Sequence, residues 1–293
     1  MPFNQLELAP QGRAPVIVRI FESTQPAKAV VIIGPAMGVS QSFYGLFAEW
    51  LAVQGYVAIT FDYRGMGLAA PPTLRGFKAD IFDWARDCDA VIELASSRLP
   101  RLPLYWIGHS LGGQLLGLMS NRNRLTRVVT VAAGSGYWHE NSWPTKRVVW
   151  ALWFGIAPII TPLAGYFPGK RLRIVGNLPR GVIEQWRRWC LNPEYVVGVE
   201  GEQVRAAYND VRLPILSISL TDDEMMSDRS IHSLHGLYGN AHIEYRRIAP
   251  RDLGAKRIGH FGFFRQQFEA KLWTAVSTWL AKDQDQTNST SLE

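Results

Sequence analysis

Residues 104–119 read Leu-Tyr-Trp-Ile-Gly-His-Ser-Leu-Gly-Gly-Gln-Leu-Leu-Gly-Leu-Met, centred on the pentapeptide Gly108-His109-Ser110-Leu111-Gly112. An apolar run typical of a strand precedes the pentapeptide, and a stretch that can form a helix follows it. Ser110 therefore lies where a strand must reverse sharply into a helix, and a side chain at either flanking glycine would collide with neighbouring backbone. The pattern predicts a strained serine whose hydroxyl projects at the C-terminal edge of a sheet. The alternative is a glycine-rich turn with an unreactive Ser110.

The composition indicates one large α/β domain with room for an inserted subdomain. The chain has 293 residues, of which 47% are hydrophobic and 19% charged, with a net charge of +6. Cys88 and Cys190 lie far apart without metal-ligand spacing, so we expect buried free thiols in a reducing compartment, with one disulfide as the alternative. The N-terminal residues lack the basic-then-apolar order of a signal peptide, and we expect a cytoplasmic location. The sequence carries no nucleic-acid motif, and we expect neither a metal nor an organic cofactor.

Short apolar runs alternate with helical stretches along most of the chain, which is typical of a mostly parallel sheet with crossover helices. Amphipathic segments at 3–8 and 16–22 predict antiparallel edge strands. The other expected strands are 29–33, 56–61, 104–107, 128–132, 214–219 and 243–248. The expected helices are 43–54, 79–97, one that begins at Ser110, 228–237 and 263–281.

The alternation stops after Gly134 and resumes near Asn209. The interval contains several prolines, which break long helices, and six of the eleven tryptophans of the chain: Trp138, Trp143, Trp150, Trp153, Trp186 and Trp189. We expect an α-helical cap at 134–209, inserted into a core formed by 1–133 and 210–282, with a polar tail at 283–293. No residue from 148 to 168 is charged, but prolines and glycines interrupt this stretch. We therefore expect a cap with an apolar face, turned toward substrate or dipping into lipid, rather than a transmembrane span. Contact with a membrane surface stays an alternative that is not the expected one.

To act as a nucleophile, the Ser110 hydroxyl needs a base that takes its proton, and the base needs an acid that orients it. His260 lies in a glycine-flanked loop after the last strand, from which its imidazole can reach the sheet edge. The acid should follow the strand 214–219, where Asp222 and Asp223 are adjacent. We prefer Asp223. The chain order Ser110, Asp223, His260 is then the order expected when the serine lies in a turn between a strand and a helix.

An oxyanion formed at the reacting carbonyl needs two preorganised N–H donors. The backbone N–H of Leu111, directly after the serine, is the first candidate. The second should come from the loop 34–38, which follows the strand 29–33. Pro35 has no N–H, so Ala36 is the best candidate and Met37 the next.

These pieces resemble the α/β-hydrolase superfamily, in its serine-nucleophile, esterase- and lipase-like branch. The matching parts are the loop 34–38, the D-x-R-G-x-G turn at 62–67, the serine turn at 108–112, Asp223 and His260. The resemblance implies an α/β-hydrolase fold and a role for Asp62 and Arg64 in tying their turn together. The sequence departs from the family at Gly34-Pro35, where a His-Gly pair is usual, and this leaves the second oxyanion donor open.

The expected function is a serine hydrolase that cleaves a carboxylic ester through an acyl-enzyme. The tryptophan-rich cap suggests an apolar or aromatic small-molecule substrate, although the same tryptophans could form the core of the cap itself. A thioesterase or acyltransferase with the same triad is one alternative. A non-catalytic small-molecule receptor on this fold is another.

Overall fold

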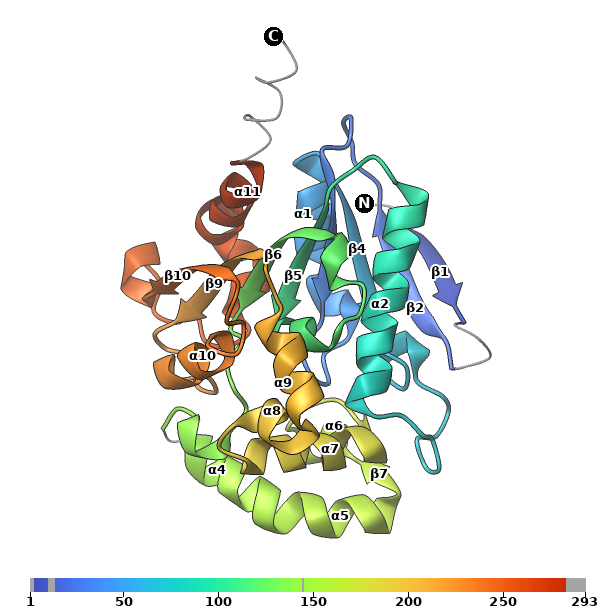
Figure 1. The fold of residues 1–293 in the computed structure, drawn as a ribbon, viewed down its shortest axis with the longest axis vertical. Coiled ribbons are helices and arrows are strands. Elements are labelled where there is room, and N and C mark those ends of the chain that lie inside the picture. Colours follow the sequence, from blue (N-terminus) through green and yellow to red (C-terminus); the bar gives the residue numbers. More distant parts are fainter. Residues whose placement is uncertain (1–2, 10–13, 144, 283–293) are drawn as a thin grey trace.

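The centre of the molecule is an eight-stranded sheet in the order β1-β2-β4-β3-β5-β6-β9-β10 (Figure 1). The computed structural model describes residues 3–9, 14–143 and 145–282, so the expected polar tail at 283–293 lies outside the described residues. The strands are β1 (Asn4–Leu8), β2 (Val16–Phe21), β3 (Ala29–Gly34), β4 (Tyr56–Asp62), β5 (Leu104–His109), β6 (Leu125–Val131), β9 (Pro214–Leu220) and β10 (His242–Ile248). Each strand lies where an apolar or amphipathic run predicted one.

The sheet is parallel except at one edge, as expected. β1 pairs antiparallel with β2, and β2 pairs antiparallel with β4. All pairs from β4 through β3, β5, β6 and β9 to β10 are parallel. The carboxyl ends of β3, β5, β6 and β9 therefore meet at one edge, where an α/β sheet places its functional groups.

Helices cover both faces of the sheet because alternate strand residues point to opposite sides and both sides are apolar. Val31 and Ile33 pack in the cluster that holds α1 (Gly45–Val53) and α11 (Thr274–Ala281). Val30 and Ile32 pack in the other cluster. That second cluster contains α2 (Ile81–Arg98), α3 (Leu111–Gln114) and α10 (Asp228–His235).

Two predicted helices differ from the expectation in length. α3 is a single turn, followed by a 3-10 turn at Leu115–Leu118. The last helix begins at Glu269 rather than at 263, because 3-10 turns occupy Gly262–Phe264 and Gln266–Phe268. Consecutive Phe263 and Phe264 are both buried, and tight turns bury adjacent side chains where one amphipathic helix face would not.

Residues 134–209, here called the inserted segment, lie beyond the carboxyl edge of the sheet and add no strand to it (Figure 1). Its helices are a 3-10 turn (Trp138–Glu140), α4 (Thr145–Ala151), η7 (Leu152–Ile156), α5 (Ala157–Ala164), α6 (Gly169–Leu172), α7 (Arg180–Leu191), α8 (Tyr195–Glu200) and α9 (Glu202–Asn209). The sequence did not predict the two-stranded ladder of β7 (Tyr166–Phe167) and β8 (Leu178–Pro179). Two-residue strands are too short to produce a periodic signal.

Candidate active site

Ser110 occupies the sharp turn between β5 and α3 that the pentapeptide predicts. Its φ of 49° and ψ of −113° lie in a region that costs a non-glycine residue roughly 1–3 kcal/mol. A Cβ at Gly108 would lie 2.4 Å from the Gly112 carbonyl oxygen, and one at Gly112 would lie 2.1 Å from the Gly34 carbonyl oxygen. Only hydrogen fits at both glycines, because Gly108 lies against the backbone of the turn itself and Gly112 lies against the backbone of β3. The serine residue is 7% exposed.

His260 and Asp223 form a buried pair at the same edge of the sheet. The His260 Nδ1 lies 2.9 Å from Asp223 Oδ2 and 3.1 Å from Oδ1. Asp223 Oδ1 also accepts hydrogen bonds from the backbone N–H groups of Met225 and Met226, at 2.7 and 2.8 Å. These contacts fix the carboxylate, and the carboxylate in turn fixes the orientation of the imidazole.

The two acids beside Asp223 bind the backbone of the loop that carries His260. Asp222 Oδ2 accepts from the N–H groups of Ile258 and Gly259, at 2.8 and 3.1 Å. Glu224 Oε2 accepts from the N–H of His260 at 3.0 Å. Three successive acidic residues therefore hold one loop, and only the middle one contacts the imidazole. The cap of α10 comes instead from the Ser227 hydroxyl, which accepts from the Ser230 N–H.

His109, inside the Ser110 turn, connects the turn to the His260 loop. Its Nε2 donates to the His260 carbonyl oxygen at 3.1 Å, which leaves Nδ1 to accept from the Tyr44 hydroxyl at 2.9 Å. Burial, followed by the nearby His260, holds the pKa of His109 well below its ordinary value, so the ring stays neutral and keeps this tautomer. Its ring centre is 5.2 Å from that of His260.

The Ser110 hydroxyl makes no hydrogen bond with any described residue, His260 included. Hydrogen bonds to a base are often long without substrate and tighten once substrate binds. The hydrogen bond from the His109 ring to the His260 carbonyl oxygen still places Ser110 and His260 in adjoining segments.

The loop 34–38 does not supply the donor that the sequence favoured. The Ala36 N–H donates to the buried Tyr44 hydroxyl at 2.9 Å, so it is already occupied. The N–H groups of Met37 and Leu111 have no hydrogen-bond partner among the residues that the structure describes. The Met37 and Leu111 N–H groups can therefore bind a further acceptor, whereas the Ala36 N–H is engaged with Tyr44. No sequence signal indicated Tyr44, because 65 residues separate it from His109.

Asp62 and Arg64 stabilise the D-x-R-G-x-G turn, as the resemblance implies. Asp62 accepts from the N–H groups of Gln41 and Leu68 at 2.8 and 3.0 Å. Arg64 forms a buried ion pair with Asp87 of α2, with its Nε donating to Asp87 Oδ1 at 2.8 Å. A Cβ at Gly67 (φ 51°) would lie 2.2 Å from the Asp62 carboxylate, which explains that glycine.

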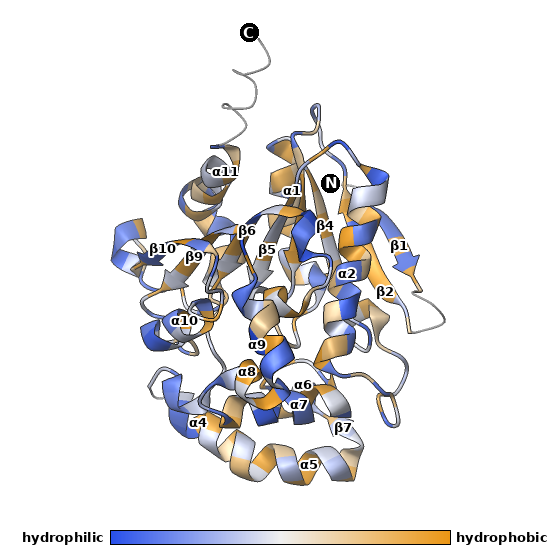
Figure 2. Cartoon of the chain, viewed as in Figure 1, coloured by the Kyte–Doolittle hydropathy of each residue, from blue (hydrophilic) through white to orange (hydrophobic). Residues whose placement is uncertain are grey.

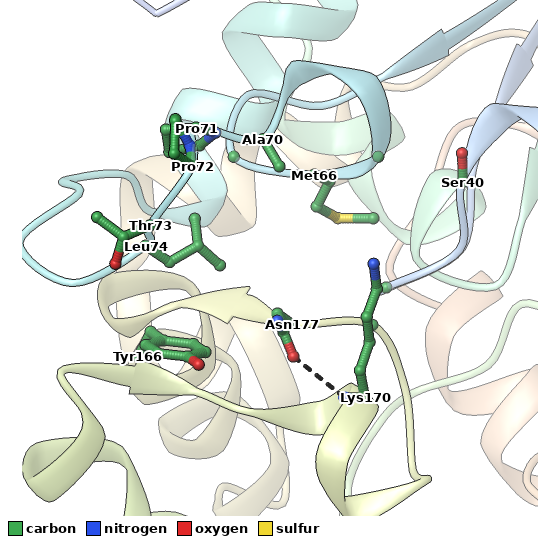
Figure 3. Close-up of a pocket in the computed structure, with 14 residues that line it drawn as sticks. Ser40, Met66, Ala70, Pro71, Pro72, Thr73, Leu74, Tyr166, Lys170 and Asn177 are labelled. Carbon is green, nitrogen blue, oxygen red and sulfur yellow. Dashed lines mark hydrogen bonds between the residues drawn. The ribbon is translucent and has the colours of Figure 1, made fainter.

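A cavity of about 320 Å³ lies between the core and the inserted segment, beside the loop 34–38 (Figure 3). Met66, Leu74 and Tyr166 supply apolar walls. Ser40, Lys170 and Asn177 supply polar groups, and Figure 3 shows the Lys170 side chain extending toward the chain segment that carries Ser40. Ser110 is not among the lining residues.

The inserted segment contacts the loop 34–38 directly. The Gly176 N–H donates to the Gly38 carbonyl oxygen at 3.1 Å. A Cβ at Gly38 (φ 72°) would lie 2.7 Å from the Gly176 nitrogen, so both positions need glycine for this approach.

The tryptophans of the inserted segment do not line the cavity of Figure 3. Trp153 and Trp189 are buried, and Trp153 packs edge-on against Trp186 with 5.0 Å between ring centres. Trp143 and Trp150 are instead exposed. These four side chains form the interior and the outer face of the segment.

Comparisons with known proteins agree with this architecture. Residues 25–161 match the family described as "Serine aminopeptidase, S33". The fold is similar to a soluble variant of monoglyceride lipase from Saccharomyces cerevisiae in complex with a substrate analog, with a TM-score of 0.67, 15% identity and 96% of each chain covered. It is also similar to a highly thermostable carboxyl esterase from Bacillus coagulans, with a TM-score of 0.64, 12% identity and coverage of 96% of this chain and 99% of the esterase.

A third similar structure is a thioesterase domain from the curacin biosynthetic pathway, with a TM-score of 0.56, 13% identity and coverage of 96% of this chain and all (100%) of that domain. Together with the sheet order, these likenesses show that the chain has the α/β-hydrolase fold, which it shares with solved structures of esterases and lipases.

Proposed function

We propose that this chain is a serine hydrolase that cleaves a carboxylic ester through an acyl-enzyme. The observation that carries the proposal is the buried Asp223–His260 pair, which lies in a loop bonded to the strained Ser110 turn. A neutral imidazole with its Nδ1–H on a carboxylate presents a basic Nε2, which a serine nucleophile requires.

In the first half-reaction, the Ser110 hydroxyl oxygen attacks the ester carbonyl carbon while His260 Nε2 takes the hydroxyl proton. The carbonyl oxygen becomes an oxyanion, and the free N–H groups of Leu111 and Met37 are the donors we assign to it. Collapse of this intermediate breaks the bond to the alcohol oxygen. His260 returns its proton to that oxygen, and the alcohol leaves.

In the second half-reaction, water attacks the acyl-enzyme and His260 takes its proton. The same two N–H groups stabilise the second oxyanion, and the proton returns to Ser110 as the acid is released. Asp223 accepts from the Nδ1–H throughout and stabilises the imidazolium. His109 does not compete for the proton, because burial holds its pKa far below the ordinary value.

The inserted segment acts in this proposal as a cap, with 1–133 and 210–282 as the catalytic core. Its contact with Gly38 and the cavity beside it support a role in substrate access. The apolar walls from Met66, Leu74 and Tyr166 suit an apolar or aromatic small-molecule ester. Both cysteines are free and buried, which suits a reducing compartment, and the cytoplasm stays our expected location.

The comparisons raise two other classes of substrate, peptides with a free amino terminus and acyl thioesters. An aminopeptidase would need a carboxylate for the substrate ammonium group, but the described lining of this cavity contains Lys170 and no acidic side chain. A thioester would react with the same triad, and the similarity to a thioesterase domain keeps that alternative.

A kinetic panel tests the proposal. We expect turnover of short and medium p-nitrophenyl esters, a smaller rate with aminoacyl anilides, and loss of essentially all turnover in Ser110→Ala. A faster rate with matched acyl thioesters would favour the thioesterase. Saturable binding of esters without turnover would instead favour a receptor.

A further inference from the structure

The outermost helix of the inserted segment is apolar on the side that faces away from the protein. Residues Thr145–Ala164 form one 20-residue helix that is long and apolar enough to cross a membrane, yet only 22% of its most apolar window is buried. Half of the large hydrophobic side chains that the structure exposes lie between 143 and 163, namely Trp143, Val148, Trp150, Phe154, Ile159 and Leu163. Such a concentration is unusual, because scattered single hydrophobics are the norm on a protein surface.

The helix has a separate face that packs against the protein. Leu152, Trp153, Ala157 and Thr161 are buried, and the Arg187 Nε of α7 donates to the Trp153 carbonyl oxygen at 2.6 Å. The opposite face carries Phe154, Ile159 at 60% exposure and Leu163 at 74%. A helix that packs on one side only is normally polar on the other. We call the exposed side, with Trp143, Val148 and Trp150, the outer apolar face; Figure 2 shows this helix along the edge of the molecule farthest from the sheet.

The inserted segment is rich in positive charge, and part of it lies beside the outer apolar face. No aspartate or glutamate occurs from 141 to 183, while Lys146, Arg147, Lys170, Arg171, Arg173 and Arg180 do. Arg147 shares a surface hollow with Trp143 and Trp150, and its guanidinium lies 4.6 Å from the Trp143 ring centre. Arg188 of α7 shares another hollow with Pro158 and Pro162 of α5. The one carboxylate in that second hollow, Glu184, is paired with Arg180 at 2.7 Å.

We propose that the outer apolar face binds the surface of an anionic lipid bilayer. Apolar side chains would enter the acyl boundary, Trp143 and Trp150 would lie at headgroup depth, and Arg147 and Arg188 would contact lipid phosphates. The helix lies on the bilayer rather than across it, because spanning would expose Trp153 and Thr161 to lipid and remove Arg187 from its carbonyl partner. Complementary charge favours a lipid surface over a second copy of this chain, whose own face would carry the same positive charge.

The test is flotation of the full chain with phosphatidylcholine vesicles, with and without phosphatidylglycerol. We expect binding to the vesicles that contain phosphatidylglycerol, weaker binding to phosphatidylcholine alone, and a loss of binding as salt is raised. The triple variant Trp150→Ser/Ile159→Ser/Leu163→Ser should weaken binding by about tenfold or more. Val53→Ser on α1, an exposed hydrophobic far from this helix, is the matched control and should bind normally. Arg147→Gln/Arg188→Gln should remove the preference for phosphatidylglycerol and keep the weaker binding.

Circular dichroism and turnover of a water-soluble ester report whether each variant is folded. A folded triple variant that binds vesicles like the unchanged chain would overturn the proposal, as would an unchanged chain that binds neither vesicle. Light scattering measures the molar mass in solution and so tests the other occupant of this face, a second copy of the chain. A dimer that the triple variant abolishes, without vesicle binding, would make the outer apolar face an interface between copies and would also overturn it.

Discussion

Asp222, Asp223 and Glu224 show how adjacent residues of one charge take different tasks. All three bind the 258–260 loop, but Asp222 and Glu224 accept from its backbone, whereas Asp223 accepts from the His260 imidazole. The sequence could place an acid after β9 but could not choose it by chemistry, because the choice depends on which side chain turns toward His260.

Asp223→Asn should lower kcat by on the order of 10⁴, because an amide cannot hold the Nδ1–H tautomer or stabilise the imidazolium. Asp222→Asn is the matched variant. Its remaining carbonyl oxygen can still accept from Ile258 and Gly259, so a much smaller loss is expected. Steady-state kinetics on one ester decides between them, and the reverse ranking would make Asp222 the orienting acid.

Tyr44→Phe tests whether Tyr44 positions the N–H donors for the transition state or contributes to substrate binding. The Tyr44 hydroxyl accepts from Ala36 and donates to His109, so it joins the loop 34–38 to the Ser110 turn. Its loss leaves a buried N–H without a partner, at a cost to stability of about 1–3 kcal/mol. We expect kcat to fall by roughly tenfold with KM nearly unchanged, since the donors act on the transition state.

The control for this variant is Tyr63→Phe, which removes a hydrogen bond of 3.2 Å to the Pro35 carbonyl oxygen in the same loop but does not touch His109. A fall in kcat of equal size in Tyr63→Phe would reduce the role of Tyr44 to general support of the loop.

The candidate residues that the sequence could predict are those marked by local patterns. Ser110 was visible from two glycines and His260 from its loop after the last strand. Met37, Tyr44 and the tasks of the neighbouring acids were not visible, because they depend on contacts between segments distant in the sequence. Ala36 was the best candidate by position alone, and the hydroxyl of Tyr44 occupies its N–H.

At the scale of elements, the strands were predictable and the helix ends were not. Amphipathic segments defined the antiparallel strands β1 and β2, and apolar runs bounded by polar residues defined the parallel strands, because both faces of a parallel sheet are covered. The last helix begins six residues late, since burial of Phe263 and Phe264 imposes 3-10 turns that no helical period reveals. The β7–β8 ladder in the inserted segment was missed for its shortness.

Tyr166→Ala tests whether the inserted segment shapes the substrate site. Tyr166 lines the cavity beside the loop 34–38. Loss of its ring should enlarge the cavity and shift the preference of the enzyme toward longer or bulkier acyl esters. The matched control is Ile159→Ala, on the outer apolar face, which should leave the ranking of soluble esters unchanged. Ratios of kcat/KM across an acyl series provide the measurement, and equal ratios in both variants would remove the segment from substrate selection.

At the scale of the whole molecule, buried neutral histidines make stability depend on pH. His235 of α10 accepts from the Thr130 hydroxyl of β6 at 2.8 Å and donates to the Ile231 carbonyl oxygen at 2.7 Å. Burial lowers its pKa from 6.5 to about 4. The unfolded chain therefore binds a proton between these values when the folded chain does not, so stability falls as the pH drops from 6.5 toward 4.

The expected loss over that window is roughly 3 kcal/mol, and the low pKa of His109 adds to it in the same direction. Urea unfolding at several pH values measures the slope. His235→Gln should cost stability at pH 7 but flatten the pH dependence, whereas His242→Gln, at an exposed position, should change neither. An unaltered slope in His235→Gln would show that other groups cause the acid sensitivity.

The most direct measurement of the central claim is covalent labelling with a fluorophosphonate, followed by mass mapping of the modified peptide. The account predicts one adduct, on Ser110, because among the serines of residues 3–9, 14–143 and 145–282 only Ser110 lies in a strained turn beside a buried Asp–His pair. Labelling should slow by orders of magnitude in His260→Ala, which lacks the base. An adduct on another serine, or labelling of Ser110 at the same rate without His260, would contradict the assignment of this site.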